Sequence, residues 1–353
     1  MSLVLTGSQV MQVLDIDLAL AAAQEAFQAY GEGRANMPPK SYLLLARGDF
    51  RAMYGEIFLP EGHICGLKWV NVHPENRAKG LLTVMAKIIL NDPETGLEFA
   101  DLDGTHVTDF RTGAAGGLAA KYLSRQDASR VGLIGAGAQA RTQLAALLRV
   151  RSIREVVIFD RHLSHSEDFA ADIAASYGIA ARAVGNAEDA VKNMDIVVTT
   201  TPSNTPLVQR AWVTPGTHIN AIGADAAGKE ELDPAILQDA KVVVDDWAQA
   251  SHSGEINVPL SQGLLKPGQI YGSLGEIAAG KKPGRTDPDA ITVFDSTGLI
   301  IQDLALAYAV YLRAKERGTA GCRNRSGGSS CAPRCARAGK NRSVRRLHPG
   351  APG

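Results

Sequence analysis

The chain has 353 residues, of which 45% are hydrophobic and 21% are charged, a composition typical of a soluble protein with two globular domains. Its 37 Lys and Arg residues balance 37 Asp and Glu residues, but eight of these cations and none of the acids lie in residues 319–353. Residues 1–318 therefore carry a charge near −8, which offers no basic face for nucleic acid.

No apolar run approaches the roughly 18 residues of a membrane span. The first residues also lack the basic stretch, the apolar core and the cleavage site of a secretory signal. We therefore expect a cytoplasmic protein that makes no contact with a membrane.

The N-terminal third predicts one helix followed by a sheet. Apolar residues recur at helical spacing over residues 7–30, and Gly31 and Gly33 end this pattern. Short apolar runs separated by turn residues follow, which predicts strands with mostly antiparallel pairing. These runs cover residues 41–45, 52–59, 64–72, 82–90 and 97–102. Thr105 can then cap a helix over residues 106–123.

After residue 130, strand-like runs alternate with helical stretches. The predicted strands cover residues 131–134, 156–159, 196–200, 218–222, 242–244 and 291–294. Such alternation is typical of parallel βαβ units, and it predicts an α/β fold with a Rossmann doubly wound parallel sheet beside an α+β domain. A last helix, at about residues 298–315, is expected to return to the first domain. The α+β domain would then comprise residues 1–115 and 300–318, and the Rossmann domain residues 116–299.

The C-terminal segment, residues 319–353, has a different composition. Its Gly, Ser, Arg and Pro content cannot bury enough apolar surface to fold, so we expect a disordered or non-native basic tail. Weak contact with RNA or an anionic surface is the alternative. Its cysteines, Cys322, Cys331 and Cys335, match no zinc pattern, and no metal site is expected. Cys65 alone provides no disulfide, which is consistent with a reducing compartment.

A glycine-rich turn follows the first strand of the predicted parallel sheet. Gly135 permits a tight turn, Gly137 lets the backbone approach a pyrophosphate, and Ala140 stands where the third glycine of the fingerprint often lies. The pyrophosphate would rest at the N-terminus of the following helix. Asp160 ends the next strand 23 residues after Gly137, where it can accept both ribose hydroxyls. This favours NAD as cofactor, although Arg161 leaves NADP possible.

Three further side chains are candidates for chemistry. Lys68 lies in an apolar strand and is either a solvent-facing residue or a buried amine that binds a carboxylate or exchanges a proton. Asp225 follows a predicted parallel strand, where ligands bind, and the alternative role is a helix cap. Arg111, with Thr112, could reach the pyrophosphate or lie on a helix surface. The chain has no nucleophile elbow and no His-Glu-x-x-His motif.

Ten short motifs are spread over roughly residues 5–317. They are MPPKS (37–41), GLKWVN (66–71), GLLTVMA (80–86), LNDPETG (90–96), DGT (103–105), RTGAA (111–115), IGAGAQA (134–140), NAIGAD (220–225), GEI (254–256) and FDSTG (294–298). With these motifs the chain resembles the ornithine cyclodeaminase/μ-crystallin family, most closely its archaeal-type alanine dehydrogenase branch. The resemblance implies a homodimer in which the first domain binds substrate and forms the dimer contact.

The resemblance also implies roles for individual residues. Lys40, Arg51 and Lys68 match positions that hold the substrate carboxylate, and Lys68 is also a candidate for proton transfer. Asp225 matches the acid that assists catalysis at the substrate amine. Cofactor contacts are expected, besides Gly135 and Gly137, from Thr83, Arg111, Thr112, Ala138, Gln139, Asp160, Arg161, Asn220, Ala221, Ile222, Lys229 and Ser296.

The activity that the resemblance implies is NAD-dependent oxidative deamination of L-alanine to pyruvate and ammonia, with reductive amination as its reverse. The alternatives are an ornithine cyclodeaminase, which forms proline and ammonia, a ketimine reductase, and a μ-crystallin-like binding protein without enzymatic activity. Two departures from the family leave the substrate open. Tyr54-Gly55 follows Met53 where the family often has Pro-Ala, and Leu82 replaces a usual proline.

Overall fold

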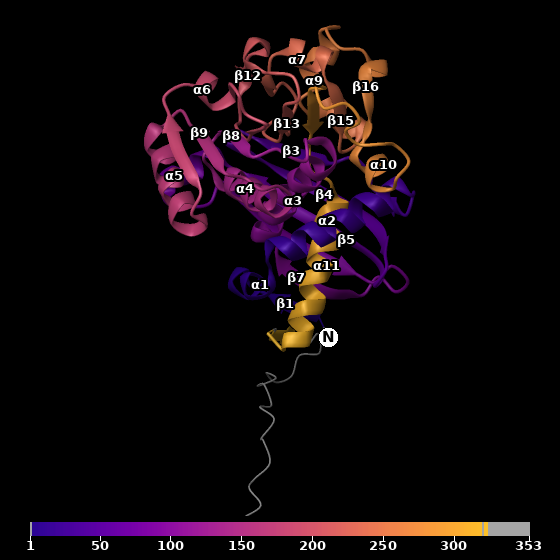
Figure 1. The fold of residues 1–353 in the computed structure, drawn as a ribbon. Helices are drawn as coiled ribbons and strands as arrows, with labels where there is room; N and C mark the ends of the chain where they lie inside the picture. Colours follow the sequence, from indigo (N-terminus) through magenta and orange to yellow (C-terminus); the bar gives the residue numbers. More distant parts are fainter. Residues whose placement is uncertain (1, 320, 324–353) are drawn as a thin grey trace, which may run out of the picture.

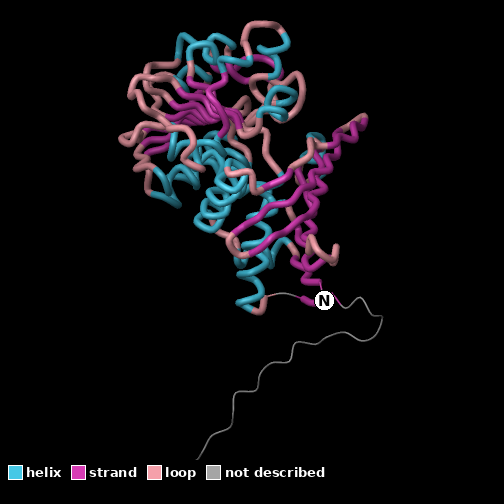
Figure 2. Tube along the Cα trace, turned by 90° about the vertical axis from the view of Figure 1, so that its right-hand side faces the viewer, coloured by secondary structure: helices cyan, strands magenta, loops and turns pink. Residues whose placement is uncertain are grey.

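The computed structural model describes residues 2–319 and 321–323, which form two lobes, each built on a sheet (Figures 1 and 2). One lobe has a mixed sheet with helices on one side, and the other has a parallel sheet with helices on both faces. The predicted fold class, a Rossmann sheet beside an α+β domain, is confirmed.

The mixed sheet is antiparallel except where β1 pairs with β7. Its strands in spatial order are β18 (Gly321–Arg323), β1 (Ser2–Leu5), β7 (Glu98–Asp103), β6 (Val84–Asn91), β5 (Gly62–Val72), β4 (Gly48–Leu59) and β2 (Ala35–Asn36), with β3 (Ser41–Leu45) also paired to β4. The five predicted strands are confirmed. β4 begins four residues earlier than expected, because Gly48 and Asp49 pair with Leu45 and Leu44 of β3.

The single helix predicted over residues 7–30 is wrong, because the chain forms two helices there. These are α1 (Gly7–Val13) and α2 (Ile16–Gly31). Asp15 separates them: its backbone is extended, and its carboxylate accepts a hydrogen bond from the Leu18 N–H at 2.7 Å. An N-cap of this kind starts a new helix even where the apolar spacing continues.

The predicted cap at Thr105 is also wrong. α3 (Thr105–Leu123) has Gly104 at its N-cap position, and Thr105 is its first helical residue. The Thr105 hydroxyl instead accepts a hydrogen bond from the Ala86 N–H of β6 at 3.2 Å. This bond ties the start of the helix to the sheet and does not cap the helix.

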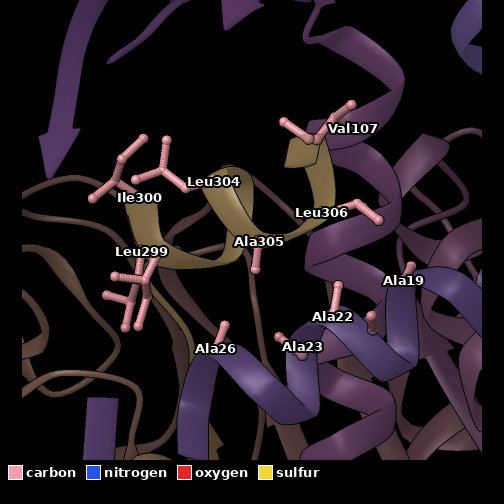
Figure 3. Close-up of a cluster of buried hydrophobic side chains, with 14 of the residues drawn as sticks. Ala19, Ala22, Ala23, Ala26, Val107, Leu299, Ile300, Leu304, Ala305 and Leu306 are labelled. Atoms are coloured by element: carbon pink, nitrogen blue, oxygen red, sulfur yellow. The ribbon is translucent and has the colours of Figure 1, made fainter. Parts of the chain in front are cut away.

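The last helix, α11 (Ile300–Arg317), packs against α2 and against β4, β5 and β6 (Figure 1). Alanines of α2 face Leu304 and Ala305 of α11, with Val107 of α3 nearby, so the backbones approach closely (Figure 3). The two ends of the chain therefore share one core, as the sequence predicts. The boundary expected after residue 115 falls inside α3, and the division into domains stays a prediction.

The second sheet is parallel throughout. Its strands in spatial order are β10 (Ala180–Val184), β9 (Glu155–Phe159), β8 (Arg130–Ile134), β11 (Ile196–Thr199), β13 (His218–Ala221), β17 (Thr292–Asp295), β15 (Lys241–Val244) and β16 (Ile270–Ser273). The two edge strands, β10 and β16, are absent from the prediction, because β10 is rich in alanine and half of β16 is Gly272 and Ser273.

Nine helices and helical turns complete the described part of the second lobe. They are α4 (Ala138–Val150), α5 (Leu163–Tyr177), α6 (Ala187–Val191), α7 (Pro234–Asp239), α8 (Trp247–Ser253), α9 (Asn257–Ser261), α10 (Leu274–Ala278), η2 (Arg210–Trp212) and η3 (Pro267–Gln269). β12 (Asn204–Val208) pairs with β14 (Glu230–Leu232), and η1 (Pro74–Lys79) lies in the first lobe. Among the helices of the described residues, none has the length and apolar character needed to cross a membrane.

The expectation of a disordered tail from residue 319 is wrong for residues 321–323, which pair with β1 as β18. The rest of that tail, residues 324–353 with Cys331 and Cys335, lies outside the described residues.

Candidate active site

A cavity of about 130 Å³ lies where the inner face of the mixed sheet meets the carboxyl ends of the parallel strands. Nine of the predicted site residues line it: Lys40, Arg51, Lys68, Arg111, Thr112, Gln139, Ile222, Asp225 and Ser296. A larger hollow, of about 350 Å³, lies at Tyr30 and Tyr271, away from all of them. The site is therefore assigned by its chemistry and not by its size.

Strand alternation directs the first group of side chains into the cavity. Arg51 and Met53 of β4 point to the same face as Lys68 and Val70 of β5, because successive side chains of a strand alternate. Lys68 is only 1% exposed. The interpretation of Lys68 as a solvent-facing residue is therefore wrong.

Lys68 and Arg111 share one carboxylate, that of Asp303 in the first turn of α11. Lys68 Nζ lies 2.7 Å from Asp303 Oδ2, and Arg111 Nε lies 3.1 Å from Asp303 Oδ1. Burial and the charge of Arg111 lower the pKa of Lys68 to about 7, although Asp303 opposes this shift. Arg111 is buried, so its interpretation as a helix-surface residue is wrong. A lysine with this pKa can exchange a proton near neutral pH.

Asp225 forms a second charged group in the loop after β13. Its carboxylate binds Arg51 Nη1 at 2.7 Å and Lys229 Nζ at 2.6 Å, and Arg51 also binds Asp49 at 2.8 Å. Burial disfavours ionisation of Asp225, but Arg51 and Lys229 outweigh it and hold its pKa below the usual range. The side chain pairs with cations and caps none of the described helices, so the helix-cap alternative is wrong. Asp225 is therefore a fixed negative charge at the cavity.

The loop after β17 forms the opposite wall. The buried carboxylate of Asp245 accepts hydrogen bonds from the backbone N–H groups of Thr297 and Gly298, at 2.6 and 2.7 Å. Lys40 donates to the Thr297 carbonyl, and burial lowers its pKa to about 8. Gly298 has φ of 79°, and a Cβ there would lie 2.4 Å from Arg111 Nη1. Only glycine fits this close approach.

The glycine turn has the geometry that a dinucleotide requires. Gly135 has φ of 108°, and the space beside Gly137 is open, since a Cβ built there meets no atom within 4 Å. Gly137 places no side chain on the N-terminus of α4, and Ala138 is exposed, so N–H groups face outward. Asp160 closes the turn by accepting from the Ala136 N–H at 3.1 Å. These features fit a pyrophosphate and a ribose.

Two buried polar atoms in the lining of the cavity lack a partner within the described part of the chain. They are Gln139 Oε1 and Ser296 Oγ. A buried polar group without a hydrogen bond is costly, so each atom is expected to meet an additional bonding group in the cavity. A nicotinamide carboxamide, which both donates and accepts hydrogen bonds, would meet this need.

The structure does not show whether several of the predicted residues can contact a cofactor. The Asn220 side chain binds His218 and the Gly116 carbonyl in the core, so only its backbone can face a ligand. Ala221 is fully buried and Arg161 is exposed. Thr83 is partly buried beside β6. Contacts of these residues, and of Thr112, with a cofactor stay predictions.

Three carboxylates of the site, Asp49, Asp245 and Asp303, are missing from the sequence-based set. Asp303 carries a signal in hindsight, because it interrupts an apolar stretch at the start of α11 and is 0% exposed. A charge inside the buried stripe of a helix requires a partner. Asp49 and Asp245 carry no comparable signal.

A pair of buried acids lies beside the loop after β17. Asp295 Oδ1 and Glu255 Oε2 have no hydrogen-bond partner among the described residues. Burial and the neighbouring Asp245 raise the pKa of Asp295 to about 8, and burial and Glu231 raise that of Glu255 well above its usual value. Unfolded Asp and Glu have pKa values near 4. The folded chain therefore binds these protons more tightly. The stability that the Asp295 proton adds fades as the pH rises from about 4 to about 8.

Asp295→Asn is expected to remove this pH dependence, since asparagine can keep the bond from the Ile256 N–H. The unfolding free energy of the variant relative to the native chain should rise between about pH 5 and 8, by at most about 4 kcal/mol. Thermal and urea unfolding at several pH values measure it. Asp239→Asn, which removes an exposed carboxylate paired with Arg210, is the control. Parallel stability curves for Asp295→Asn and the native chain would contradict the prediction.

Comparisons with known proteins agree with this geometry. The sequence model of the ornithine cyclodeaminase/mu-crystallin family matches residues 1–318. The chain is 50% identical over 313 residues to an alanine dehydrogenase of Archaeoglobus fulgidus, covering 89% of this chain and 95% of that protein. It is 33% identical to a Δ1-pyrroline-2-carboxylate reductase of Bacillus cereus, covering 90% of this chain and 98% of the other, and 34% identical to an iminosuccinate reductase of Paracoccus denitrificans with the same coverage.

Two solved structures are similar over nearly their whole length. An archaeal alanine dehydrogenase dimer with bound NAD superposes with a TM-score of 0.86 at 49% identity, covering 90% of this chain and 97% of the other. The Δ1-pyrroline-2-carboxylate reductase of Thermococcus litoralis, in complex with NADH and L-proline, has a TM-score of 0.87 at 35% identity, covering 91% and 100%.

Proposed function

Because the chain belongs to the ornithine cyclodeaminase/mu-crystallin family, we propose that it uses NAD to oxidise L-alanine to pyruvate and ammonia and catalyses the reverse reductive amination. In coarser terms, it is an NAD-dependent oxidoreductase that acts on amino acids or on the imines derived from them, as its relatives do.

The observation that carries the finer proposal is the mixed lining of the cavity. Four cations line it, Lys40, Arg51, Lys68 and Arg111, and they suit a carboxylate. On the sheet face Arg51 and Lys68 lie directly across from Val70 and Met53. The whole apolar lining consists of Met53, Val70, Val72, Val84 and Ile222. A small apolar side chain fits beside these residues, whereas the second ammonium of ornithine would be desolvated there without an anion.

Binding would begin at the cations that line the cavity. We expect the substrate carboxylate to take charge-assisted hydrogen bonds from Lys68 and Arg51, with Lys40 nearby. Asp225 would lie at the substrate amine, where its fixed negative charge stabilises an ammonium or iminium group. This orientation would turn the Cα–H toward the cofactor, and positioning of this kind supplies much of the rate of such reactions.

NAD, held at the turn of Gly135 and Gly137 and at Asp160, would supply the acceptor for the substrate's Cα hydride. As the Cα–H bond breaks, the amine would lose a proton to give an imine. Water then adds to Cα, and the C–N bond breaks to release ammonia and leave the 2-oxo acid. Lys68 is the expected proton carrier, because its pKa of about 7 suits transfer in both directions. Asp225, with a depressed pKa, is a weak base and acts chiefly through its charge.

A second candidate is reduction of a cyclic imine such as Δ1-pyrroline-2-carboxylate. The apolar part of the lining would accept a proline-like ring, and the similar structure from Thermococcus litoralis holds L-proline. An ornithine cyclodeaminase is less favoured, because Asp225 is the one carboxylate that lines the cavity within residues 2–319 and it is engaged by Arg51 and Lys229. The presence of Lys68, Arg51 and Asp225 favours an enzyme over a binding protein.

The chain is proposed to act as a homodimer. The similar archaeal alanine dehydrogenase is a dimer. The helices leave the outer face of the mixed sheet uncovered (Figure 2). This face exposes large apolar side chains. They are Leu43, Leu45, Tyr54, Phe58, Trp69 and Met85. A second copy of the chain would bury this face.

The deciding experiment follows NADH absorbance with purified protein, pyruvate and ammonium. NADH loss that requires both compounds supports the proposal. NADH loss with Δ1-pyrroline-2-carboxylate, but not with pyruvate and ammonium, would establish the imine reductase instead. Proline formed from ornithine without net NADH change would establish a cyclodeaminase. NADPH in place of NADH should be a poor substrate, because the Asp160 carboxylate would repel a 2′-phosphate.

A further inference from the structure

Asp303 connects the last helix, α11, with two elements of the first lobe beside the cavity. It lies in the first turn of α11 and is 0% exposed. Its two oxygens each bind one cation from the first lobe, Lys68 from β5 and Arg111 from α3. Within residues 2–319 it is the only carboxylate at ion-pair distance from either. A buried carboxylate between two buried cations is either a structural link or a device that arranges them for a ligand.

The pattern of hydrogen bonds favours arrangement for a ligand. A lysine ammonium has three donors and an arginine guanidinium has five. Asp303 takes one donor of each, and the Gln302 amide oxygen takes one more from Arg111 at 2.9 Å. Both cations line the cavity, so the remaining donors are available on that side. The two groups are thus held against their mutual repulsion, with donors left for a second anion.

We propose that Asp303 is a positioning residue for substrate, which holds Lys68 and Arg111 side by side as one carboxylate-binding edge of the cavity. The proposal rests on the proposed function only in requiring a substrate with a carboxylate, which alanine, pyruvate and cyclic imino acids all have. Asp303 touches neither substrate nor cofactor in this role and acts through the two cations.

The charge of Asp303 supports this role. Burial and Arg111 lower the pKa of Lys68, and Asp303 raises it. Other charges near Lys68 include Lys40, which also lowers its pKa. Without the Asp303 charge, Lys68 would lose its proton at a lower pH and would bind a carboxylate less well at neutral pH.

Asp303→Asn tests the proposal in the full-length protein. The KM for pyruvate is expected to rise by about tenfold or more, since a charge-assisted contact is weakened. The alkaline limb of kcat/KM should move to lower pH, while the affinity for NADH stays within about twofold. Asp195→Asn is the matched control, because Asp195 is also buried and paired with an arginine, Arg125, in the other lobe. It should lower stability without moving the pH profile. A native KM and pH profile for Asp303→Asn would overturn the proposal.

A double variant guards against failure of Asp303→Asn to fold. Lys68→Met with Asp303→Asn removes a buried cation together with its anion, which is less destabilising than leaving one of them unpaired. If Asp303 acts through the two cations, Asp303→Asn lowers kcat/KM less in the Lys68→Met background than in the native chain, because only Arg111 is left to position. An equal loss in both backgrounds would contradict the proposal.

A binding measurement separates this proposal from the proposed function. Pyruvate, L-proline and L-alanine are each added to the protein with saturating NADH or NAD, and the rise in Tm is recorded. An Asp303→Asn variant that keeps the rise with NADH but loses the further rise with a carboxylate supports the positioning role, even if pyruvate is not the substrate. No further rise in the native chain with any carboxylate would overturn it.

Discussion

An Asp225→Asn variant is expected to lose at least about 100-fold in kcat while it binds NADH nearly as tightly as the native chain. The substitution keeps the shape of the side chain but removes the one carboxylate that lines the cavity among the described residues, which we place beside the substrate amine. Loss of a group that stabilises developing charge or assists proton transfer typically costs 10²–10⁴-fold, by order of magnitude. Steady-state kinetics and NADH fluorescence titration measure the two quantities.

The fold of this variant should survive, because Arg51 keeps its second partner, Asp49. Lys229 is partly exposed and can be solvated, with a side chain 20% exposed. Asp239→Asn, far from the cavity, is the control for loss of a negative charge. An equal loss of turnover and NADH affinity in Asp225→Asn would assign Asp225 a role in the structure or in cofactor binding.

A Lys68→Met variant is expected to raise the KM for pyruvate and to lower kcat, with a combined loss of about 10³-fold in kcat/KM. The methionine keeps an unbranched stem in the core but removes both the charge that binds the carboxylate and the exchangeable proton. The remaining carboxylate of Asp303 keeps Arg111 as its partner. A rise in KM together with a fall in kcat indicates that Lys68 contacts the substrate both in the ground state and in the transition state.

The pH dependence of the native chain provides a second test of Lys68. Because its pKa is about 7, kcat/KM for pyruvate should fall as the pH rises above about 7, when the amine loses its charge. The variant should lack this limb. Lys192→Met, which removes an exposed lysine paired with Glu188, should leave rate and profile unchanged. A native profile in Lys68→Met would show that another group, with Lys40 the first candidate, titrates there.

Features carried by short stretches of sequence were predictable. The glycine turn and the strand ending at Asp160 each depend on a few neighbouring residues. Breaks in a pattern were harder to predict. The Asp15 cap divides a helix whose apolar spacing continues. β10 forms from an alanine-rich segment because a neighbouring strand supplies its hydrogen bonds.

The partners of the site residues could not be predicted, because they come from distant parts of the chain. Lys68 and Asp303 are 235 positions apart, and Arg51 and Asp225 are 174 apart. No local rule relates such positions. Motifs that match a known family name the cations of the site and Asp225, but the ion pairs that Asp49 and Asp303 make with these cations emerge only in the folded structure.

The origin of Asp303 on the last helix has a consequence for the order of events during synthesis on the ribosome. Arg111 precedes Asp303 by 192 positions. At roughly 5–20 residues per second, the strand with Lys68 and the helix with Arg111 would wait on the order of 10–40 s for their shared counter-ion. Until then two cations would have to be buried without an anion, which is costly. The nascent first lobe should therefore stay open, or be sheltered by a chaperone, until α11 has been synthesised.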